Sequence, residues 1–359
     1  MQTSALTAPS SGGAASSPTS ASSSHRLRRA TLESPRTTRS TYWWGVPTFL
    51  AAPHDPDPAG CDVALVGVPH SSGNGSTERD QHLGPSAVRH VSAGYQRRHR
   101  RFGVVPHDLC RLRDLGDVVM PEFMVSDRAI KDIEARFREI AAAGARPLAV
   151  GGDHSITLPI LRALASAERP LALVHLDAHL DTYDRIDTWF GVVDSAAHWA
   201  SKAVHEHLVD PSSSIQLGMR GHMSPWTQAN VSDELGYLVL DKARCDELGS
   251  DGVVTEMLKR IGDHPLYVSF DLDCLDPSVA PGVSNLEPRE DGFTMTQAAR
   301  ILQGLRGHDL VGGDVVCLMP TKDSPNNITA MNATAILFEL ATLAAERVAT
   351  AGPTRAAAG

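Results

Sequence analysis

Short apolar runs separated by helix-like stretches are the feature that most constrains how this chain folds. The runs are strand-sized: residues 63–68, 147–150, 171–176, 215–217, 237–240, 266–272 and 310–316. Strands that are apolar throughout belong to parallel sheets with helices packed on both faces. We therefore predict a single α/β domain of three layers (helix, sheet, helix) around a mostly parallel central sheet.

The clearest helical stretch lies between the first two of these runs. Ile130, Ile133, Phe137 and Ile140 recur at helical spacing within residues 126–143. Ser126 has the chemistry of an N-cap, and Gly144 is a typical C-terminal stop.

The two ends of the chain differ in composition from the rest. Residues 1–40 are rich in Ser, Thr, Ala, Pro and Gly, and contain five arginines but one acid. Such a segment buries too little apolar surface to order itself, so we expect a disordered tail. An Arg- and Ser-rich, acid-poor segment is also typical of an organellar transit peptide. We expect the globular domain to span residues 41–349 and a flexible tail to span residues 350–359.

Charge and cysteine usage limit the partners and the compartment. The 359 residues have a formal net charge of −9, which disfavours nucleic acid or an anionic membrane surface as the main partner and is compatible with a cationic substrate. The five cysteines are widely spaced and include no CxxC pair. This indicates a reducing compartment, so we predict a cytoplasmic protein. The apolar stretches look strand-sized, so we predict no membrane span.

Acids and histidines follow three of the predicted strands. In parallel sheets the ligand site lies at the carboxyl ends of the strands. His154 follows the run 147–150, and Asp271 and Asp273 end the run 266–272. Asp177, His179 and Asp181 follow the run 171–176 at intervals of two, which places them on one face of an extended backbone. All six residues are candidate metal ligands.

The charge of this set points to bound cations. A single Asp in a loop is commonly a turn residue, but four carboxylates gathered in a partly buried crevice would repel one another. Two divalent ions bring four positive charges and would balance them. Carboxylate and imidazole ligands without thiolate suit Mn²⁺, and imidazole also admits Ni²⁺ or Zn²⁺.

Three motifs in this order resemble those of the ureohydrolase family, which includes arginases, agmatinases and other amidinohydrolases. They are GGDHS at 151–155, DAHLD at 177–181 and SFDLDCLDPSVAPG at 269–282. The resemblance covers most of the chain after residue 42. It implies an arginase-like fold, a catalytic domain over residues 41–349, and a homotrimer or homohexamer.

The resemblance also implies a role for each ligand. His154 and Asp181 would bind the first ion, and His179 and Asp273 the second. Asp177 and Asp271 would bridge the two ions, which would be Mn²⁺ or Ni²⁺. A hydroxide held between them would attack a guanidinium carbon and release urea with an amine or ammonia.

Three catalytic residues are implied in the same way. Asp273 would accept a proton from the hydroxide. Glu287 would hold the guanidinium by paired hydrogen bonds, although a surface loop acid would look the same in sequence. His198 would pass a proton to the leaving amine, unless it only packs beside Trp199.

The sequence departs from the family pattern around the substrate. Tyr183 stands where arginases carry an Asn, and Gly282–Glu290 replaces the run GTGTPEPGG of agmatinases. His198-Trp199-Ala200 replaces His-Gly-Thr, Cys317 replaces the acid of VVExxP, and Ser71 replaces the Asp of GxPxDxG. Arginine is therefore not the expected substrate.

Aromatic residues near the lid suggest a short pocket. Trp189, Phe190 and Trp199 lie close together in sequence, and with Tyr183 they predict an aromatic wall that holds a compact cation by cation–π contacts. The wall favours guanidine or a short or alkylated guanidine over agmatine. The same side chains could instead only pack the lid onto the sheet.

Other functions stay open at this point. Agmatinase or guanidinobutyrase activity is the nearest alternative. A catalytically silent partner subunit or a deacetylase-like amide hydrolase would belong to other classes.

Overall fold

The computed structural model describes residues 45–74, 79–183, 188, 191–221, 231–287 and 291–351. All of them belong to one compact unit, Arg39–Gly359. The tail predicted at 1–40 and the predicted wall residues Trp189 and Phe190 lie outside the described residues. At the other end, the last helix continues to Ala351, two residues past the boundary predicted at 349.

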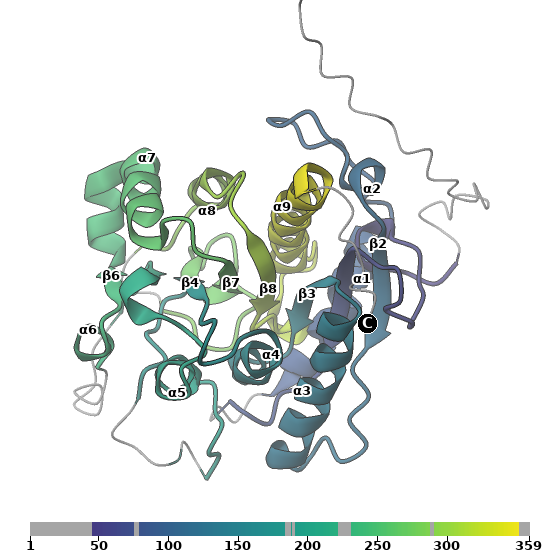
Figure 1. The fold of residues 1–359 in the computed structure, drawn as a ribbon, viewed down its shortest axis with the longest axis horizontal. Helices are drawn as coiled ribbons and strands as arrows, with labels where there is room; N and C mark the ends of the chain where they lie inside the picture. The colour runs from purple at the N-terminus through teal and green to yellow at the C-terminus, as the bar shows by residue number, and fades with distance from the viewer. Residues whose placement is uncertain are drawn as a thin grey trace, which may run out of the picture. The chain divides into compact units, whose positions relative to one another are not determined.

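Eight parallel strands form one central sheet, in the order β2-β1-β3-β8-β7-β4-β5-β6 (Figure 1). The strands are β1 (Val63–Val68), β2 (Leu112–Asp117), β3 (Arg146–Gly151), β4 (Ala172–Leu176), β5 (Ile215–Leu217), β6 (Leu238–Leu240), β7 (Leu266–Asp271) and β8 (Leu310–Val316). Seven of them match the predicted apolar runs, and the predicted fold class is confirmed.

The strand that the sequence did not reveal is β2, at one edge of the sheet. Its sequence, LRDLGD, carries charges that do not fit an apolar run. Asp114 is nevertheless buried, because Arg89 binds its carboxylate at 2.8 Å and the main-chain N–H of Phe49 donates to it at 2.9 Å. A buried carboxylate is tolerated when it is paired in this way.

Nine described α-helices accompany the sheet. They are α1 (Gly84–Ser92), α2 (Pro106–Leu109), α3 (Ser126–Ala142), α4 (Thr157–Leu164), α5 (Trp199–His205), α6 (Ser232–Leu235), α7 (Lys242–Ile261), α8 (Met295–Gly304) and α9 (Ile328–Ala351). Helices α1, α7, α8 and α9 share a core with one face of the sheet, and α3, α4 and α5 with the other (Figure 1). In β1, Val63 and Leu65 enter the first core, whereas Ala64 and Val66 enter the second.

Helix α3 matches the predicted helix, with one difference at its start. Ser126 is the first helical residue, and Val125 occupies the N-cap position without a side-chain hydrogen bond. The predicted stop is correct: Gly144 has φ 79°, and its N–H donates to the carbonyl of Ala141 at 2.9 Å. Glycine adopts this left-handed conformation at little cost.

Helix α9 is long and apolar enough, by length and composition, to cross a membrane, which the search for apolar runs had not anticipated. However, 78% of its most apolar window is buried inside the protein. Its buried residues, such as Ile336 and Leu340, belong to the same core as β3 and β8. In this structure α9 is therefore a core helix.

The four adjacent strands β3, β8, β7 and β4 position the candidate site. Their carboxyl ends lead into His154, Cys317, Asp271 and Asp177, respectively. The chain passes from β3 to β4 across two intervening strands, and such a point in a parallel sheet commonly opens a crevice for a ligand.

Candidate metal centre

The six predicted ligands come together in two groups that share Asp177. The His154 group consists of His154, Asp177, Asp181 and Asp271, and the His179 group consists of Asp177, His179 and Asp273. Both groups lie at the carboxyl ends of the central strands, as the strand pattern predicts.

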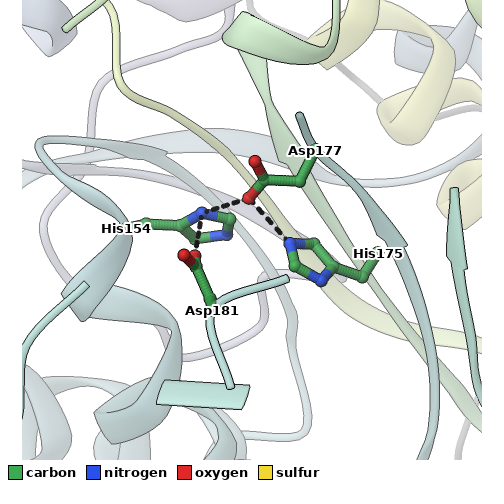
Figure 2. Close-up of side chains that lie close together, drawn as sticks. All are labelled: His154, His175, Asp177 and Asp181. Carbon is green, nitrogen blue, oxygen red and sulfur yellow. Dashed lines mark hydrogen bonds and ion pairs between the residues drawn. The ribbon is translucent and has the colours of Figure 1, made fainter. Parts of the chain in front are cut away.

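In the His154 group, one imidazole nitrogen faces three carboxylates. Nδ1 of His154 lies 3.0 Å from Oδ2 of Asp177, 3.1 Å from Oδ2 of Asp181 and 3.1 Å from Oδ2 of Asp271. Figure 2 shows the first two of these contacts. All four side chains are buried.

The other ring nitrogen of His154 fixes the tautomer. Nε2 lies 2.8 Å from the hydroxyl of Ser269, and this hydroxyl donates to Oδ1 of Asp314 at 2.8 Å. Because the hydroxyl of Ser269 donates its hydrogen bond to Asp314, its oxygen accepts the hydrogen bond that Nε2–H of His154 donates. In the neutral imidazole Nδ1 then carries the lone pair, and this buried nitrogen makes no hydrogen bond. A lone pair among three carboxylate oxygens requires a cation between them.

In the His179 group, Nδ1 of His179 lies 3.1 Å from Oδ2 of Asp273 and 3.3 Å from Oδ1 of Asp177. Asp177 thus directs one oxygen to each group, the geometry that a bridging ligand needs. Asp271 directs Oδ2 to His154, and its Oδ1 accepts the main-chain N–H of Asp273 at 2.9 Å.

The ligands after β4 converge by a turn and not by strand alternation, which corrects the sequence argument. The strand ends at Leu176, and Oδ1 of Asp177 accepts the main-chain N–H of His179 at 2.7 Å. Asp181 has φ 52°, a left-handed conformation that residues other than glycine rarely adopt. Asp177 and Asp181 therefore face His154, whereas His179 faces Asp273.

The pKa values of an imidazole and of a carboxyl group in the cluster are both raised. Burial opposes ionisation of His154, but Asp177, Asp181 and Asp271 outweigh it and hold the pKa of His154 well above its usual range. Burial, together with Asp271 and Asp177, raises the pKa of Asp273 well above its usual range. These groups need either protons or cations to coexist.

The donor set fits two divalent metal ions. Each group offers oxygen and imidazole nitrogen, which suit Mn²⁺ and also Ni²⁺. Four carboxylates balance the four charges of two such ions. Without ions, the raised pKa values of His154 and Asp273 show that the carboxylates are not balanced.

His175 supports the carboxylate of Asp177, and the sequence pattern assigned no role to His175. Its Nε2 lies 2.8 Å from Oδ2 of Asp177 (Figure 2), and its Nδ1 accepts from the amide Nε2 of Gln216 at 3.0 Å. The same amide donates to the carbonyl of Leu180 at 2.8 Å, which fixes its orientation. His175 therefore donates to Asp177. Its position two residues before Asp177 on an alternating strand is the signal that could have revealed it.

Trp199 occupies a different place from the predicted aromatic wall. Its side chain has no exposed surface, and its indole Nε1–H donates to Oδ2 of Asp181 at 2.8 Å. A fully buried ring has no face to offer to a substrate, so this part of the prediction is corrected. Tyr183, predicted to lie in the same wall, is half-buried, and its main-chain N–H donates to the carbonyl of Ala197 at 3.1 Å.

Glu287 lies at the accessible side of the His179 group. Its Oε1 is 3.3 Å from Nε2 of His179, and the side chains are 25% and 26% exposed, respectively. Gly221 adjoins it: a Cβ at Gly221 would lie 2.1 Å from Oε2 of Glu287. The chain here leaves room for the carboxylate because position 221 is a glycine.

Arg220 fixes the segment of Glu287 against the metal-ligand loop. Its Nη2 donates to the carbonyl of Asp273 at 2.7 Å, its Nη1 to that of Cys274 at 3.2 Å, and its Nε to that of Glu287 at 3.3 Å. These partners are more than 50 residues away in sequence. No sequence pattern had singled out Arg220.

His198 is buried at the start of α5. Its Nδ1 lies 2.5 Å from the hydroxyl of Ser195, which orients the imidazole. Its role as a proton donor stays a prediction.

Cys317 stands beside the His154 group. Its sulfur and the ligand atoms of His154 and Asp271 lie within 4.8 Å of one another. Burial and the nearby carboxylates of Asp271 and Asp273 raise the pKa of the Cys317 thiol well above its usual range. A neutral thiol thus occupies the place where the family pattern has an acid.

Comparisons with known proteins cover the whole of this site. A family model described as the arginase family matches residues 61–342. A guanidinopropionase from Pseudomonas aeruginosa is 40% identical over 307 residues, which are 85% of this chain and 93% of that protein. A guanidinobutyrase from the same organism is 34% identical over 301 residues, 82% of this chain and 91% of that protein.

Two solved structures are also similar to this chain along most of its length. A proclavaminate amidino hydrolase from Streptomyces clavuligerus has a TM-score of 0.77 and 32% identity, and the match covers 86% of this chain and 100% of that one. A hypothetical agmatinase from Burkholderia thailandensis has a TM-score of 0.77 and 34% identity, over 87% of this chain and 94% of that one. These matches carry the fold.

Proposed function

Because this chain belongs to the arginase family, as the resemblance of its motifs predicted, we propose that it is an amidinohydrolase that cleaves a short guanidino compound into urea and an amine or ammonia. Two divalent ions, Mn²⁺ or Ni²⁺, are its cofactors. The ligands are His154, Asp177, Asp181 and Asp271 for one ion, and Asp177, His179, Asp271 and Asp273 for the other.

The observation that carries this proposal is the position of Glu287. Its carboxylate is partly exposed and lies 3.3 Å from His179, so it faces the open side of the metal centre. A carboxylate can bind a planar guanidinium by two parallel hydrogen bonds, which fixes the carbon of that group in a defined place. Glu287 therefore supports a guanidino substrate over an acylated amine, the substrate of a deacetylase-like hydrolase.

Asp273 and His198 are proposed for the remaining steps. Two bound ions would supply Lewis acidity and lower the pKa of a water molecule. As the water oxygen bonds to the guanidinium carbon, Asp273 accepts the proton that this oxygen loses. When a C–N bond then breaks, His198 gives a proton to the leaving nitrogen, which departs as an amine or ammonia. Ser195 keeps His198 oriented for this transfer.

The relatives narrow the class of substrate. The chain is 40% identical to a guanidinopropionase and 34% identical to a guanidinobutyrase, whose names denote guanidino groups on short acids. We infer that a short guanidino acid is the first candidate and that guanidine or an alkylated guanidine is the second. The buried Trp199 removes part of the argument for guanidine itself.

A urea-release screen tests the proposal. The enzyme, loaded with Mn²⁺ or with Ni²⁺, is assayed with guanidine, methylguanidine, 3-guanidinopropionate, 4-guanidinobutyrate, agmatine and arginine. We expect the highest kcat/KM for a short guanidino acid and little activity on arginine. Highest activity on agmatine would overturn the short-substrate proposal. No urea from any substrate, with two ions bound, would indicate the catalytically silent subunit, and release of acetate from acetylated amines would indicate a deacetylase.

We also infer the assembly and the compartment. Family resemblance supports a homotrimer or homohexamer, which light scattering on the purified enzyme measures directly. All five cysteines are buried and unpaired, which supports a reducing compartment such as the cytoplasm.

A further inference from the structure

We propose that Trp199 is a positioning residue of the metal centre: its indole N–H holds the carboxylate of Asp181, so that Trp199 sets how tightly the His154 group binds its ion. The proposal rests on the dinuclear centre of the proposed function. Trp199 stands where the family pattern has the glycine of His-Gly-Thr. It is not one of the six proposed ligands, so its role is to hold a ligand in place.

The hydrogen bond from Trp199 ends on an atom of the ligand cluster. Nε1 of Trp199 lies 2.8 Å from Oδ2 of Asp181, and the same Oδ2 lies 3.1 Å from Nδ1 of His154. Trp199 has no exposed surface, so water cannot replace this partner. A buried N–H without an acceptor is costly, and the hydrogen bond therefore constrains the rotamer of Asp181.

The residue after Trp199 in α5, Ala200, holds the main chain of Asp181. The N–H of Ala200 donates to the carbonyl of Asp181 at 3.2 Å. Asp181 needs such support, because its φ of 52° is rarely adopted by residues other than glycine. The first turn of α5 thus holds Asp181 at both its main chain and its side chain.

The indole ring also packs on two histidines of the cluster. Its centroid lies 4.8 Å from that of His154, with 34° between the planes, and 4.8 Å from that of His175, with 70° between the planes. His175 in turn donates to Asp177. Trp199 therefore packs on His154 and donates to Asp181. It also packs on the ring of His175, which supports Asp177.

The indole N–H of Trp199 supports the His154 group and not the His179 group. In the His179 group, Oδ1 of Asp273 accepts the main-chain N–H of Ala178 at 3.1 Å, and Nε2 of His179 faces the partly exposed Glu287. Neither contact involves Trp199. Loss of the indole N–H should therefore weaken the binding of one ion and leave the other unchanged.

The test replaces Trp199→Phe, which keeps an aromatic ring and removes the N–H. Mn²⁺ binding to the full chain is measured by competition with a fluorescent chelator and by metal analysis after gel filtration. We expect the dissociation constant of one ion to rise by ~10- to 100-fold, the usual effect of losing a hydrogen bond to a metal ligand. At saturating Mn²⁺ the KM for the best guanidino substrate should stay unchanged.

Tyr237→Phe is the matched control. Its hydroxyl donates to the carbonyl of Ala200 at 2.9 Å, so this variant removes a buried hydrogen bond to the same helix without touching a ligand. It should leave both dissociation constants unchanged. Equal changes in the two variants would show that α5 matters only for packing, and would overturn the proposal.

A double-mutant cycle tests whether Trp199 acts through Asp181. In the background Asp181→Asn, which weakens the charged acceptor, Trp199→Phe should lower the Mn²⁺ affinity much less than it does in the native chain. Additive losses would mean that Trp199 acts independently of Asp181, and the proposal would fail.

A measurement on the native chain keeps the proposal testable if Trp199→Phe does not fold. In protein labelled with ¹⁵N at the indoles, the first equivalents of Zn²⁺ should shift an N–H signal that exchanges slowly with solvent, because Trp199 is buried beside the ion. If no slowly exchanging indole signal shifts on addition of Zn²⁺, the proposal is overturned. The metal-binding and NMR readouts use no substrate, so a wrong substrate class cannot be mistaken for a wrong role of Trp199.

Discussion

The two halves of the metal centre differ in what surrounds their ligands. Behind the His154 group stand other buried side chains: Trp199 donates to Asp181, His175 to Asp177, and Ser269 links His154 to Asp314. The His179 group is open by contrast, since His179 is 26% exposed and Glu287 is 25% exposed. The ligands of one half are enclosed by buried side chains, whereas the other half is partly open to solvent, where we propose that the substrate binds.

This difference shows how one sheet edge can serve two tasks. Buried hydrogen-bonded networks are rigid and fix the orientation of metal ligands. A substrate side needs exposed polar groups, which leaves its ligands fewer protein partners. Substitutions in the two halves should therefore separate metal binding from substrate binding.

The largest effect on turnover should come from replacing Asp271, the carboxylate at the end of β7 that faces His154. Asp271→Asn removes a negative charge from the cluster, and kcat should fall by ~10³-fold or more, the scale of several kcal/mol of lost Lewis-acid stabilisation. At least one ion should bind more weakly, as metal analysis would show. A variant that keeps two ions and normal turnover would contradict the role of Asp271 as a ligand.

A smaller effect should come from the open half. Glu287→Gln keeps the size of the side chain but loses the charge that pairs with a guanidinium, so kcat/KM should fall by ~10- to 100-fold. Steady-state kinetics at saturating Mn²⁺ would measure this. Both ions should remain bound, which distinguishes this variant from Asp271→Asn. The exposed Glu168→Gln is the control for a lost charge; unchanged kcat/KM in Glu287→Gln would remove Glu287 from the site.

The closed half should respond in metal affinity. Ser269→Ala breaks the link between His154 and Asp314, which fixes the tautomer of the imidazole. The Mn²⁺ affinity of one site should fall by ~10-fold, measured by chelator competition. Thr342→Val, which removes a buried hydroxyl inside α9, should have no such effect. If Ser269→Ala instead changes KM alone, the assignment of the two halves is wrong.

The smallest effect should appear in the pH dependence of stability. In the metal-free protein the carboxylates hold the pKa values of His154 and His179 well above their usual range, although burial opposes this. A raised pKa in the folded state stabilises the protein below the unfolded pKa of about 6.5, and this stabilisation is lost as the pH rises. Asp177, whose pKa is lowered, contributes above about pH 4 and does not change in this window.

The metal-free protein should therefore melt at a lower temperature at pH 8 than at pH 6. Metal ions replace the protons, so the gain in Tm on adding Mn²⁺ should be larger at pH 8, by a few degrees at the scale of roughly 1–2 kcal/mol. Differential scanning fluorimetry with and without EDTA would measure it. A larger gain at pH 6 would contradict the pKa shifts of both histidines.

The sequence by itself determined the class of the fold and predicted which acids and histidines gather at the candidate site. Local apolar runs such as 63–68 and 310–316 determined the strands, because a strand buried on both faces needs an apolar residue at nearly every position. The ligands His154, Asp177 and Asp271 follow strands directly, so their place at one edge of the sheet follows from parallel pairing alone.

Only the tertiary structure decided which residues support those ligands. Asp181 and Trp199 are 18 residues apart, Ser269 and His154 are 115 apart, and Arg220 meets Asp273 from 53 residues away. Such contacts leave no local pattern, since they depend on how separate loops meet above the sheet. The same limit explains Trp199: its place in the lid sequence suggested a substrate wall, whereas the packing of α5 turned it inward onto Asp181.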